Sequence, residues 1–208
     1  MEALPTIKAL EELRKGKKRK FNQSVDLIIN LREFDVKKQS VNLFVNVPHK
    51  IKELKVGAFL EKKNDLVDTI TPAEFNRYSD KKNIQNLLRD YDYFIAVAKL
   101  MPSIATTFGR YLGPAGKMPS PKQGIIMDES ESEIKSALQK FEKAARVKTK
   151  EASIKLIIGK EEMKNEDIEE NIKAVYNAVL NALPKKKENI KNVMIKFTMT
   201  KPVKINLK

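Results

Sequence analysis

Apolar and polar residues alternate through the C-terminal segment 192–205, and this pattern constrains the fold more than any other stretch. Val193, Ile195 and Phe197 recur at every second position, which is typical of a strand with one buried face. Pro202 cannot donate to a strand ladder, so the strand must break near it. The alternation resumes after the proline, and the segment therefore predicts two strand pieces joined by a corner.

The corner between the two pieces, Thr198–Thr200, is polar and is flanked by Lys196, Lys201 and Lys204. Hydroxyls and lysines that converge on a corner suit the sugar and phosphate oxygens of a nucleic acid. The same pattern is compatible with an ordinary hairpin whose polar face is solvated, and this segment alone leaves both interpretations open.

Both ends of the chain predict elements of an antiparallel α+β unit. The clearest is a helix at Asn165–Leu183, with acidic residues in its first turns and apolar residues at the 3.6-residue period. The other elements expected here are a helix at Leu4–Leu13 and strands at Val25–Leu31, Val41–Val47 and Ile154–Ile158.

The middle of the chain alternates strands with helices, which argues for a small α/β unit. Its continuous apolar run Tyr93–Ala98 suits a strand buried on both faces, as in a parallel sheet. The remaining expected elements are a strand at Leu54–Leu60, a helix start at Thr71–Glu74, helices at Asp80–Leu88, from Ser103 and at Lys135–Lys143, a Gly/Pro loop at Leu112–Pro121 and a basic connector at Arg146–Lys150.

The economical architecture is an α+β split domain, an antiparallel sheet with helices on one face, into which an α/β three-layer domain is inserted. We expect residues 1–53 and 146–208 to form the split domain and residues 54–145 to form the inserted one. The two chain crossings, near Lys50–Leu54 and Ala145–Lys150, would form a hinge.

The formal net charge of +14 and the pI of about 9.7 predict attraction to a polyanion. No long apolar run and no basic amphipathic helix rich in Trp or Phe favours a membrane as that polyanion. The chain has no cysteine, which excludes disulfides, thiolate metal sites and cysteine nucleophiles. No apolar signal core follows Met1, so we expect a cytosolic protein.

No motif supports catalysis. Gly113–Lys117 lacks the first glycine and the Ser or Thr of a phosphate-binding Walker loop, because Tyr111 and Met118 stand at those positions. His49 is the only histidine and has no ligand-like neighbours in the sequence, so a metal site or histidine-based catalysis is not expected. Phe21 follows a basic run and could present an aromatic ring to RNA, or could be the first core residue of its strand.

Five segments, taken in chain order, resemble one protein family. They are Phe21–Asp26 after a basic segment, Val47–His49, Leu112–Pro119, Ile158–Glu161 with Met163, and Phe197–Met199. They are similar to the L-one family of large-subunit ribosomal proteins, the family of the ribosome's mobile lateral stalk, and the archaeal branch is the most similar. The resemblance runs from about Lys20 to the C-terminus.

The resemblance implies a binding protein, with no enzymatic activity, cofactor or metal. Family members bind the stalk region of large-subunit ribosomal RNA through the split domain, and the stalk moves with the deacylated tRNA that leaves the exit site. Many also bind a similar fold in their own messenger RNA and repress its translation. The implied partners are thus ribosomal RNA, the protein's own messenger RNA and exit-site tRNA, for a cytoplasmic ribosomal protein that is monomeric outside the ribosome.

The implied RNA-binding set combines hydroxyls for sugar 2′-OH groups, lysines for phosphates and apolar side chains for contact. It comprises Phe21, Ser24, Asp26, Lys38, Lys150, Lys155, Asn192, Thr198, Met199 and Thr200. Two positions depart from the family: Thr200 stands where glycine is usual, and Thr149 where bacterial members carry Asp. We expect the Cβ of Thr200 to crowd a close approach of backbone. The alternative function is a generic basic RNA chaperone or architectural protein without stalk specificity.

Overall fold

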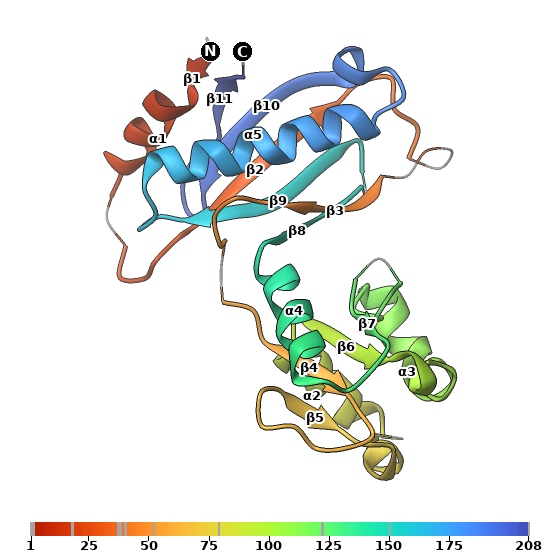
Figure 1. Cartoon of the computed structure of the whole chain (residues 1–208). Coiled ribbons are helices and arrows are strands. Elements are labelled where there is room, and N and C mark those ends of the chain that lie inside the picture. The colour runs from red at the N-terminus through yellow and green to blue at the C-terminus, as the bar shows by residue number, and fades with distance from the viewer. Residues whose placement is uncertain are drawn as a thin grey trace. The chain divides into compact units, whose positions relative to one another are not determined.

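The computed structural model describes residues 3–17, 19–36, 39, 41–51, 53–78, 80–121, 123–149 and 151–207. The chain divides into two compact units (Figure 1). Unit 1 combines Met1–Lys52 with Lys143–Lys208, and unit 2 is Glu53–Glu142. Each unit has its own buried apolar core.

Unit 1 is built on a five-stranded sheet with the order β1-β11-β10-β2-β9. The strands are β1 Leu4–Pro5, β2 Ser24–Leu31, β9 Ser153–Lys160, β10 Ile190–Phe197 and β11 Val203–Asn206. Strands β10, β2 and β9 pair antiparallel, as does β10 with β11, whereas β1 joins β11 in parallel. The predicted pair of C-terminal strands is confirmed, with Val193, Ile195 and Phe197 buried.

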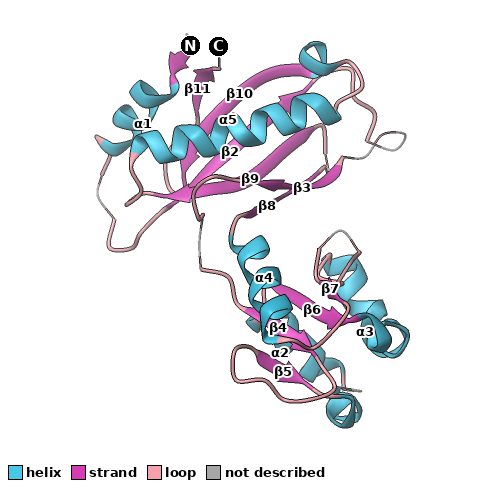
Figure 2. Ribbon diagram, viewed as in Figure 1, coloured by secondary structure: helices cyan, strands magenta, loops and turns pink. Residues whose placement is uncertain are grey.

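Two helices, α1 Thr6–Arg14 and α5 Asn165–Ala182, pack on one face of this sheet (Figures 1 and 2). Helix α5 buries Ile168, Ile172, Val175 and Val179 completely, as its periodicity predicts. Each such side chain stabilises the fold by roughly 1.5–3 kcal/mol relative to its exposed state. A short 3₁₀ helix, η3 Lys186–Asn189, connects α5 to β10.

A separate two-stranded antiparallel ribbon completes unit 1. It consists of β3 Asn42–Asn46 and β8 Ala144–Lys148. The predicted basic connector at Arg146–Lys150 is therefore wrong, because residues up to Lys148 form a strand. Ala145 and Val147 are buried in the unit 1 core and alternate with Arg146, but two small apolar residues among basic ones are a weak period-two signal.

Unit 2 contains a four-stranded, all-parallel sheet with the order β5-β4-β6-β7. Its strands are β4 Val56–Phe59, β5 Asp68–Ile70, β6 Tyr93–Val97 and β7 Ile125–Ile126. Its helices are η1 Pro72–Tyr78, α2 Lys81–Asp90, η2 Ala98–Leu100, α3 Met101–Ala115 and α4 Glu131–Glu142. Phe59, Phe94 and Phe108 belong to one apolar cluster, whereas Ile95 and Phe141 belong to the other. This confirms the inserted α/β three-layer arrangement and its buried parallel strand.

Two local predictions in unit 2 need correction. The Gly/Pro loop expected at Leu112–Pro121 begins later, because α3 continues through Ala115 with Pro114 in its last turn. Gly116 ends the helix with a φ of 70°, a left-handed conformation that glycine adopts without strain. The helix start at Thr71–Glu74 opens a 3₁₀ helix rather than an α-helix, although the Thr71 amide donates to the Glu74 carboxylate at 3.1 Å as expected.

Lys117 has a structural role in this loop. Its Nζ donates to the carbonyl oxygens of Leu88 and Tyr91, at 2.6 Å each. These carbonyls lie at the C-terminal end of α2, where carbonyl groups lack partners within the helix and the helix dipole is negative. Lys117 thus caps α2 instead of contacting a phosphate, as it would in a Walker loop.

We expect Lys117→Met to destabilise unit 2 by about 1–3 kcal/mol, because two carbonyls lose a charged donor. Tyrosine fluorescence during urea denaturation measures this change, since every tyrosine except Tyr176 belongs to unit 2 and the chain has no tryptophan. Lys140→Met, at an exposed position of α4, is the matched control. Equal denaturation midpoints for the two variants would contradict the capping role.

Candidate nucleic-acid interface

The face of the unit 1 sheet opposite α1 and α5 carries the candidate site. Side chains that alternate with the buried rows of β2, β9 and β10 point to this side. We call this surface the open face; it comprises Ser24, Asp26, Ile28, Asn30, Lys155, Ile157, Asn192, Met194 and Lys196. In the described part of the chain, the helices that pack on this sheet lie on its other side (Figure 2).

The strand register sets polar and apolar side chains of the open face beside one another. Asp26 lies opposite Lys196 on one side and Ile157 on the other. A shallow hollow of about 260 Å³ opens among Asp26, Ile28, Lys155, Leu156, Ile157 and Lys196. Two lysines above a partly apolar floor can hold a phosphate while a sugar or base rests on the floor.

Asn30 and Asn192 form a polar pair on the same face. The Asn30 Nδ2 donates to the Asn192 Oδ1 at 2.7 Å. This bond orients both amides, and the Asn30 Oδ1 can still accept and the Asn192 Nδ2 can still donate to ribose or base edges.

Asp26 is electrostatically perturbed by its surroundings. Partial burial raises the pKa of its carboxyl group above the ordinary value, and the positive charge of Lys196 offsets part of that increase. The carboxylate therefore pays a desolvation penalty in the folded protein. A 2′-hydroxyl that donates to it would relieve part of this penalty.

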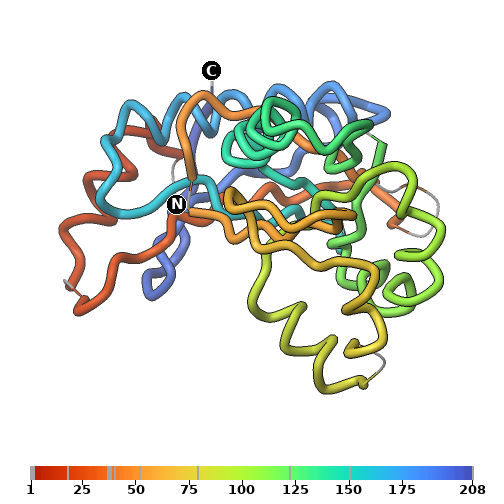
Figure 3. The backbone as a smooth tube through the Cα atoms, turned by 60° about the horizontal axis from the view of Figure 1, so that its bottom comes forward, coloured from red at the N-terminus to blue at the C-terminus, as the bar shows by residue number. Residues whose placement is uncertain are grey.

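The corner Thr198–Thr200 lies at one end of the sheet, beside the start of β2 (Figures 1 and 3). The Ser24 amide donates to the Thr198 Oγ1, and the Thr198 amide donates to the Ser24 carbonyl, both at 3.1 Å. The Thr200 Oγ1 accepts from the Phe197 amide at 2.9 Å. Both hydroxyls thus first stabilise the turn of the protein itself.

Thr200 occupies the usual glycine position without backbone strain. Among the described non-glycine residues, positive φ values occur only at Glu33 and Lys186. Thr200 therefore does not need the left-handed conformation. Its hydroxyl adds a side-chain hydrogen bond to the turn, whereas a glycine would have only the backbone bonds. The expected crowding at this position concerns contact with a ligand and stays a prediction.

Gln23 holds the corner in place and is not among the predicted site residues. Its Oε1 accepts from the Met199 amide at 3.1 Å, and its Nε2 donates to Glu161 at 3.1 Å. The side chain is buried, whereas the neighbouring Met199 is 57% exposed. The only signal in the sequence is that Gln23 lies within the Phe21–Asp26 segment.

Phe21 is not the first core residue of β2. It precedes the strand, is 52% exposed and belongs to none of the apolar clusters found among the described residues. With Met199 it provides exposed apolar surface at the corner end of the sheet.

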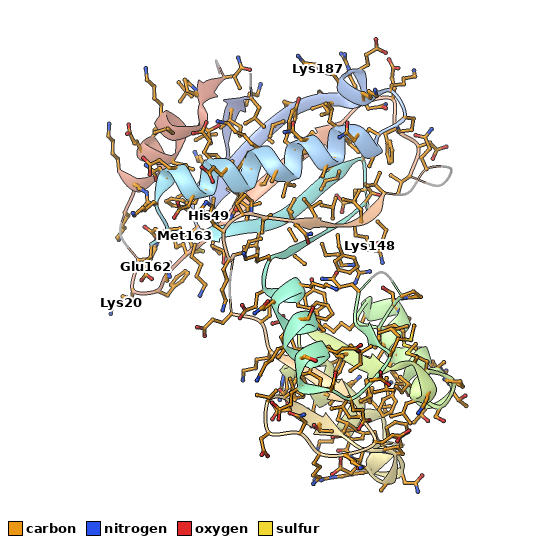
Figure 4. The ribbon with its side chains drawn as sticks, viewed as in Figure 1. Lys20, His49, Lys148, Glu162, Met163 and Lys187 are labelled. Atoms are coloured by element: carbon orange, nitrogen blue, oxygen red, sulfur yellow. The ribbon has the colours of Figure 1, made fainter. Side chains whose placement is uncertain are left out.

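The basic run before Phe21 has two parts. Arg14 is structural, because its Nη2 and Nε donate to the Met163 carbonyl at 2.6 Å and to Asn165 at 2.9 Å. Lys15, Lys17, Arg19 and Lys20 are exposed. Figure 4 places Lys20 at the same end of the sheet as Met163, with Lys187 at the far end.

Of the ten predicted site residues, Ser24, Asp26, Lys155 and Asn192 lie on the open face. Phe21, Thr198, Met199 and Thr200 lie at its corner end, and Lys38 and Lys150 lie outside the described residues. Lys196, across from Asp26, was missed as a site residue because the sequence pattern identified it only as a flank of the corner.

Thr149, the second position that departs from the family, has a structural role. It is buried, and its Oγ1 accepts from the Val41 amide at 2.9 Å.

His49 also has a structural role. Its Nε2 lies 2.8 Å from the Glu170 carboxylate, and its backbone amide donates to Asn171 at 3.0 Å, so the segment is tied to α5. Within the described ranges, no group of three or more His, Cys, Asp or Glu side chains could hold a metal ion. Within the same ranges, no helix is long and apolar enough to span a membrane.

Comparison with known proteins identifies a match over most of the chain. Residues 13–201 match the model described as the Ribosomal protein L1p/L10e family. The protein from Pyrobaculum neutrophilum named large ribosomal subunit protein uL1 is 38% identical, over 93% of this chain and 89% of that protein. The proteins of the same name from Pyrococcus abyssi and Nanoarchaeum equitans are 33% and 30% identical, over 96% of this chain and 94% and 99% of their own lengths.

The raised pKa of Asp26 makes the stability of unit 1 depend on pH. Between the unfolded and folded pKa values the folded state binds more protons, so the free energy of unfolding falls as pH rises through that window and stays lower above it. We expect Asp26→Asn to be more stable than the wild type at pH 7, with a difference that disappears below about pH 4. Urea denaturation followed by circular dichroism across this range measures the difference.

Asp65→Asn, at an exposed loop position of unit 2, controls for the general effect of removing a carboxylate. A variant Asp26→Asn that is less stable than the wild type at pH 7 would show that the interaction with Lys196 outweighs desolvation.

Proposed function

The chain belongs to the ribosomal protein L1p/L10e family, a family of non-enzymatic large-subunit ribosomal proteins, and from this membership we propose that its open face binds the stalk region of large-subunit ribosomal RNA. The observation that carries the proposal is the hollow beside Asp26, with Lys155 and Lys196 around it, on a sheet face whose other side is covered by helices. Such a face offers phosphate, sugar and base contacts together.

The proposed interface extends from the open face to the corner. It comprises Phe21, Ser24, Asp26, Lys155, Asn192, Lys196, Thr198, Met199 and Thr200, and Lys38 and Lys150 join it on the family resemblance alone. Thr198 and Thr200 act mainly by holding the shape of the corner, since their hydroxyls bond to Ser24 and Phe197. Met199 and Phe21 supply apolar contact with riboses or bases.

Two further roles belong to the proposal. The protein assists release of deacylated tRNA from the exit site as part of the stalk, and it represses translation by binding a similar RNA fold in its own messenger. It acts at the cytoplasmic ribosome and is a monomer when it is not assembled. Ribosomal and messenger RNA would occupy the same open face, so the two RNAs exclude each other.

The competing function is a generic basic RNA chaperone, which the net charge of +14 would also support. The two differ in selectivity: a chaperone binds any RNA with a steep salt dependence, whereas a stalk protein keeps its RNA against a large excess of unrelated RNA. Binding of a stalk hairpin at physiological salt, with bulk tRNA as competitor, separates them. Displacement by the competitor would favour the chaperone.

Met199→Ala tests the corner directly. We expect it to weaken stalk-RNA binding by about 1–3 kcal/mol, because a specific contact at the RNA is lost. Met127→Ala is the matched control, since Met127 is 71% exposed but belongs to unit 2. Equal affinities of both variants and the wild type in the same titration would remove the corner from the interface.

Lys155→Ala tests the open face through salt dependence. We expect the slope of log K against log salt to decrease by about one, as for a single phosphate contact. Lys155 pairs with Glu151 at 3.1 Å, and Lys135 of unit 2 pairs with Glu131 at 3.4 Å, so Lys135→Ala controls for the loss of an exposed lysine that pairs with the glutamate four residues before it. Identical slopes for the two variants would argue against a phosphate at Lys155.

A further inference from the structure

The ribbon of β3 and β8 has an outer face to which the family resemblance assigns no role. Its inner row, which includes Val45, Ala145 and Val147, is buried in the unit 1 core. The outer row alternates with it and contains Asn42, Phe44 and Asn46 of β3 and Ala144, Arg146 and Lys148 of β8, of which Ala144 is buried. An aromatic side chain is thus on the face of the ribbon directed away from the core.

Phe44 and Arg146 form a cation–π pair on this outer face. They are directly opposite in the antiparallel register, and the guanidinium carbon of Arg146 lies 5.5 Å from the centre of the Phe44 ring. Both side chains are half-buried. A guanidinium held against an aromatic ring is a planar platform of the kind on which RNA bases stack.

Polar side chains lie on both sides of the pair along the ribbon. Lys148 lies opposite Asn42 in the register, and Asn46 follows Phe44 on β3; all three are exposed. Asparagine amides bond the edges of bases, and a lysine neutralises a phosphate. The ribbon therefore combines stacking, edge recognition and charge on one surface, and Figure 4 shows Lys148 on it.

This outer face is on the same side of unit 1 as the open face. The inner rows of β3, β8, β2 and β9 share one core with the buried residues of α5. Their outer rows must therefore point away from α5, and β8 contacts β9, the strand at the edge of the five-stranded sheet. An RNA that crosses the open face can continue over β9 onto the ribbon.

We propose that the outer face of the ribbon binds an unpaired base of the same RNA, with the base stacked on the Phe44–Arg146 pair and an adjacent phosphate at Lys148. The inference rests on the proposed function, because it extends the RNA interface from the open face. An arginine stacked on a phenylalanine also supports a ribbon by itself, so the experiment must separate stacking with RNA from support of the fold.

Phe44→Trp and Phe44→Leu make this separation. Both change the volume at this position, but only tryptophan keeps a stacking surface, and the chain has no other tryptophan. We expect Phe44→Leu to weaken binding of the stalk hairpin by roughly 5- to 100-fold, in line with the loss of one stacked base, and Phe44→Trp to retain wild-type affinity. We also expect the stalk hairpin to quench the tryptophan fluorescence of the Phe44→Trp variant on binding.

Met127→Trp places a single exposed tryptophan in unit 2 and should show no such quenching. Lys148→Ala, compared with Lys135→Ala, should weaken binding and flatten the salt dependence, and it keeps the test decisive if Phe44→Leu does not fold. Wild-type affinity in Phe44→Leu and Lys148→Ala, together with unquenched fluorescence of Phe44→Trp, would overturn the ribbon site. A loss of affinity in Met199→Ala in the same titrations would leave the proposed function standing. Failure of the wild-type chain to hold the hairpin against tRNA would overturn the proposed function and the ribbon site with it.

Discussion

The pairing of β2 with two distant strands is the constraint on which unit 1 depends. One edge of β2 pairs with β10 and the other with β9, so an N-terminal segment is held between two C-terminal ones. A shift of β2 by one residue would exchange its two faces, bury Asp26 and expose Leu27. The unit 1 core and the candidate interface therefore lie on opposite faces of one sheet, and the same strand register determines both.

Elements with strong local periodicity could be predicted from the sequence, and elements formed through a distant partner could not. Helix α5 and strands β2 and β10 each carry enough alternating apolar residues to show their type without tertiary context. Strand β8 has few such residues and exists because β3, which the whole of unit 2 separates from it in the chain, supplies its ladder. Tertiary pairing overrides a weak local signal here.

The sequence could predict where the candidate site lies better than it could predict what each of its side chains does. Resemblance and hydroxyl chemistry indicated Thr198 and Met199, but Thr198 uses its oxygen on Ser24, and Met199 is held by the buried amide of Gln23. No sequence pattern distinguishes a buried glutamine from a solvated one, because burial depends on the fold around it. The same limit applies to Lys117, which the sequence marks as part of a loop and the structure as a helix cap.

The split of unit 1 around unit 2 has a consequence for synthesis on the ribosome. Unit 2 is one continuous segment and can fold as soon as it leaves the exit tunnel, whereas β2 must wait for β9 and β10 at the far end of the chain. Pairing of β1 with β11 places both ends of the polypeptide in the same sheet. The sheet of unit 1, and with it the proposed RNA interface, is therefore complete only after β9, β10 and β11 have been synthesised.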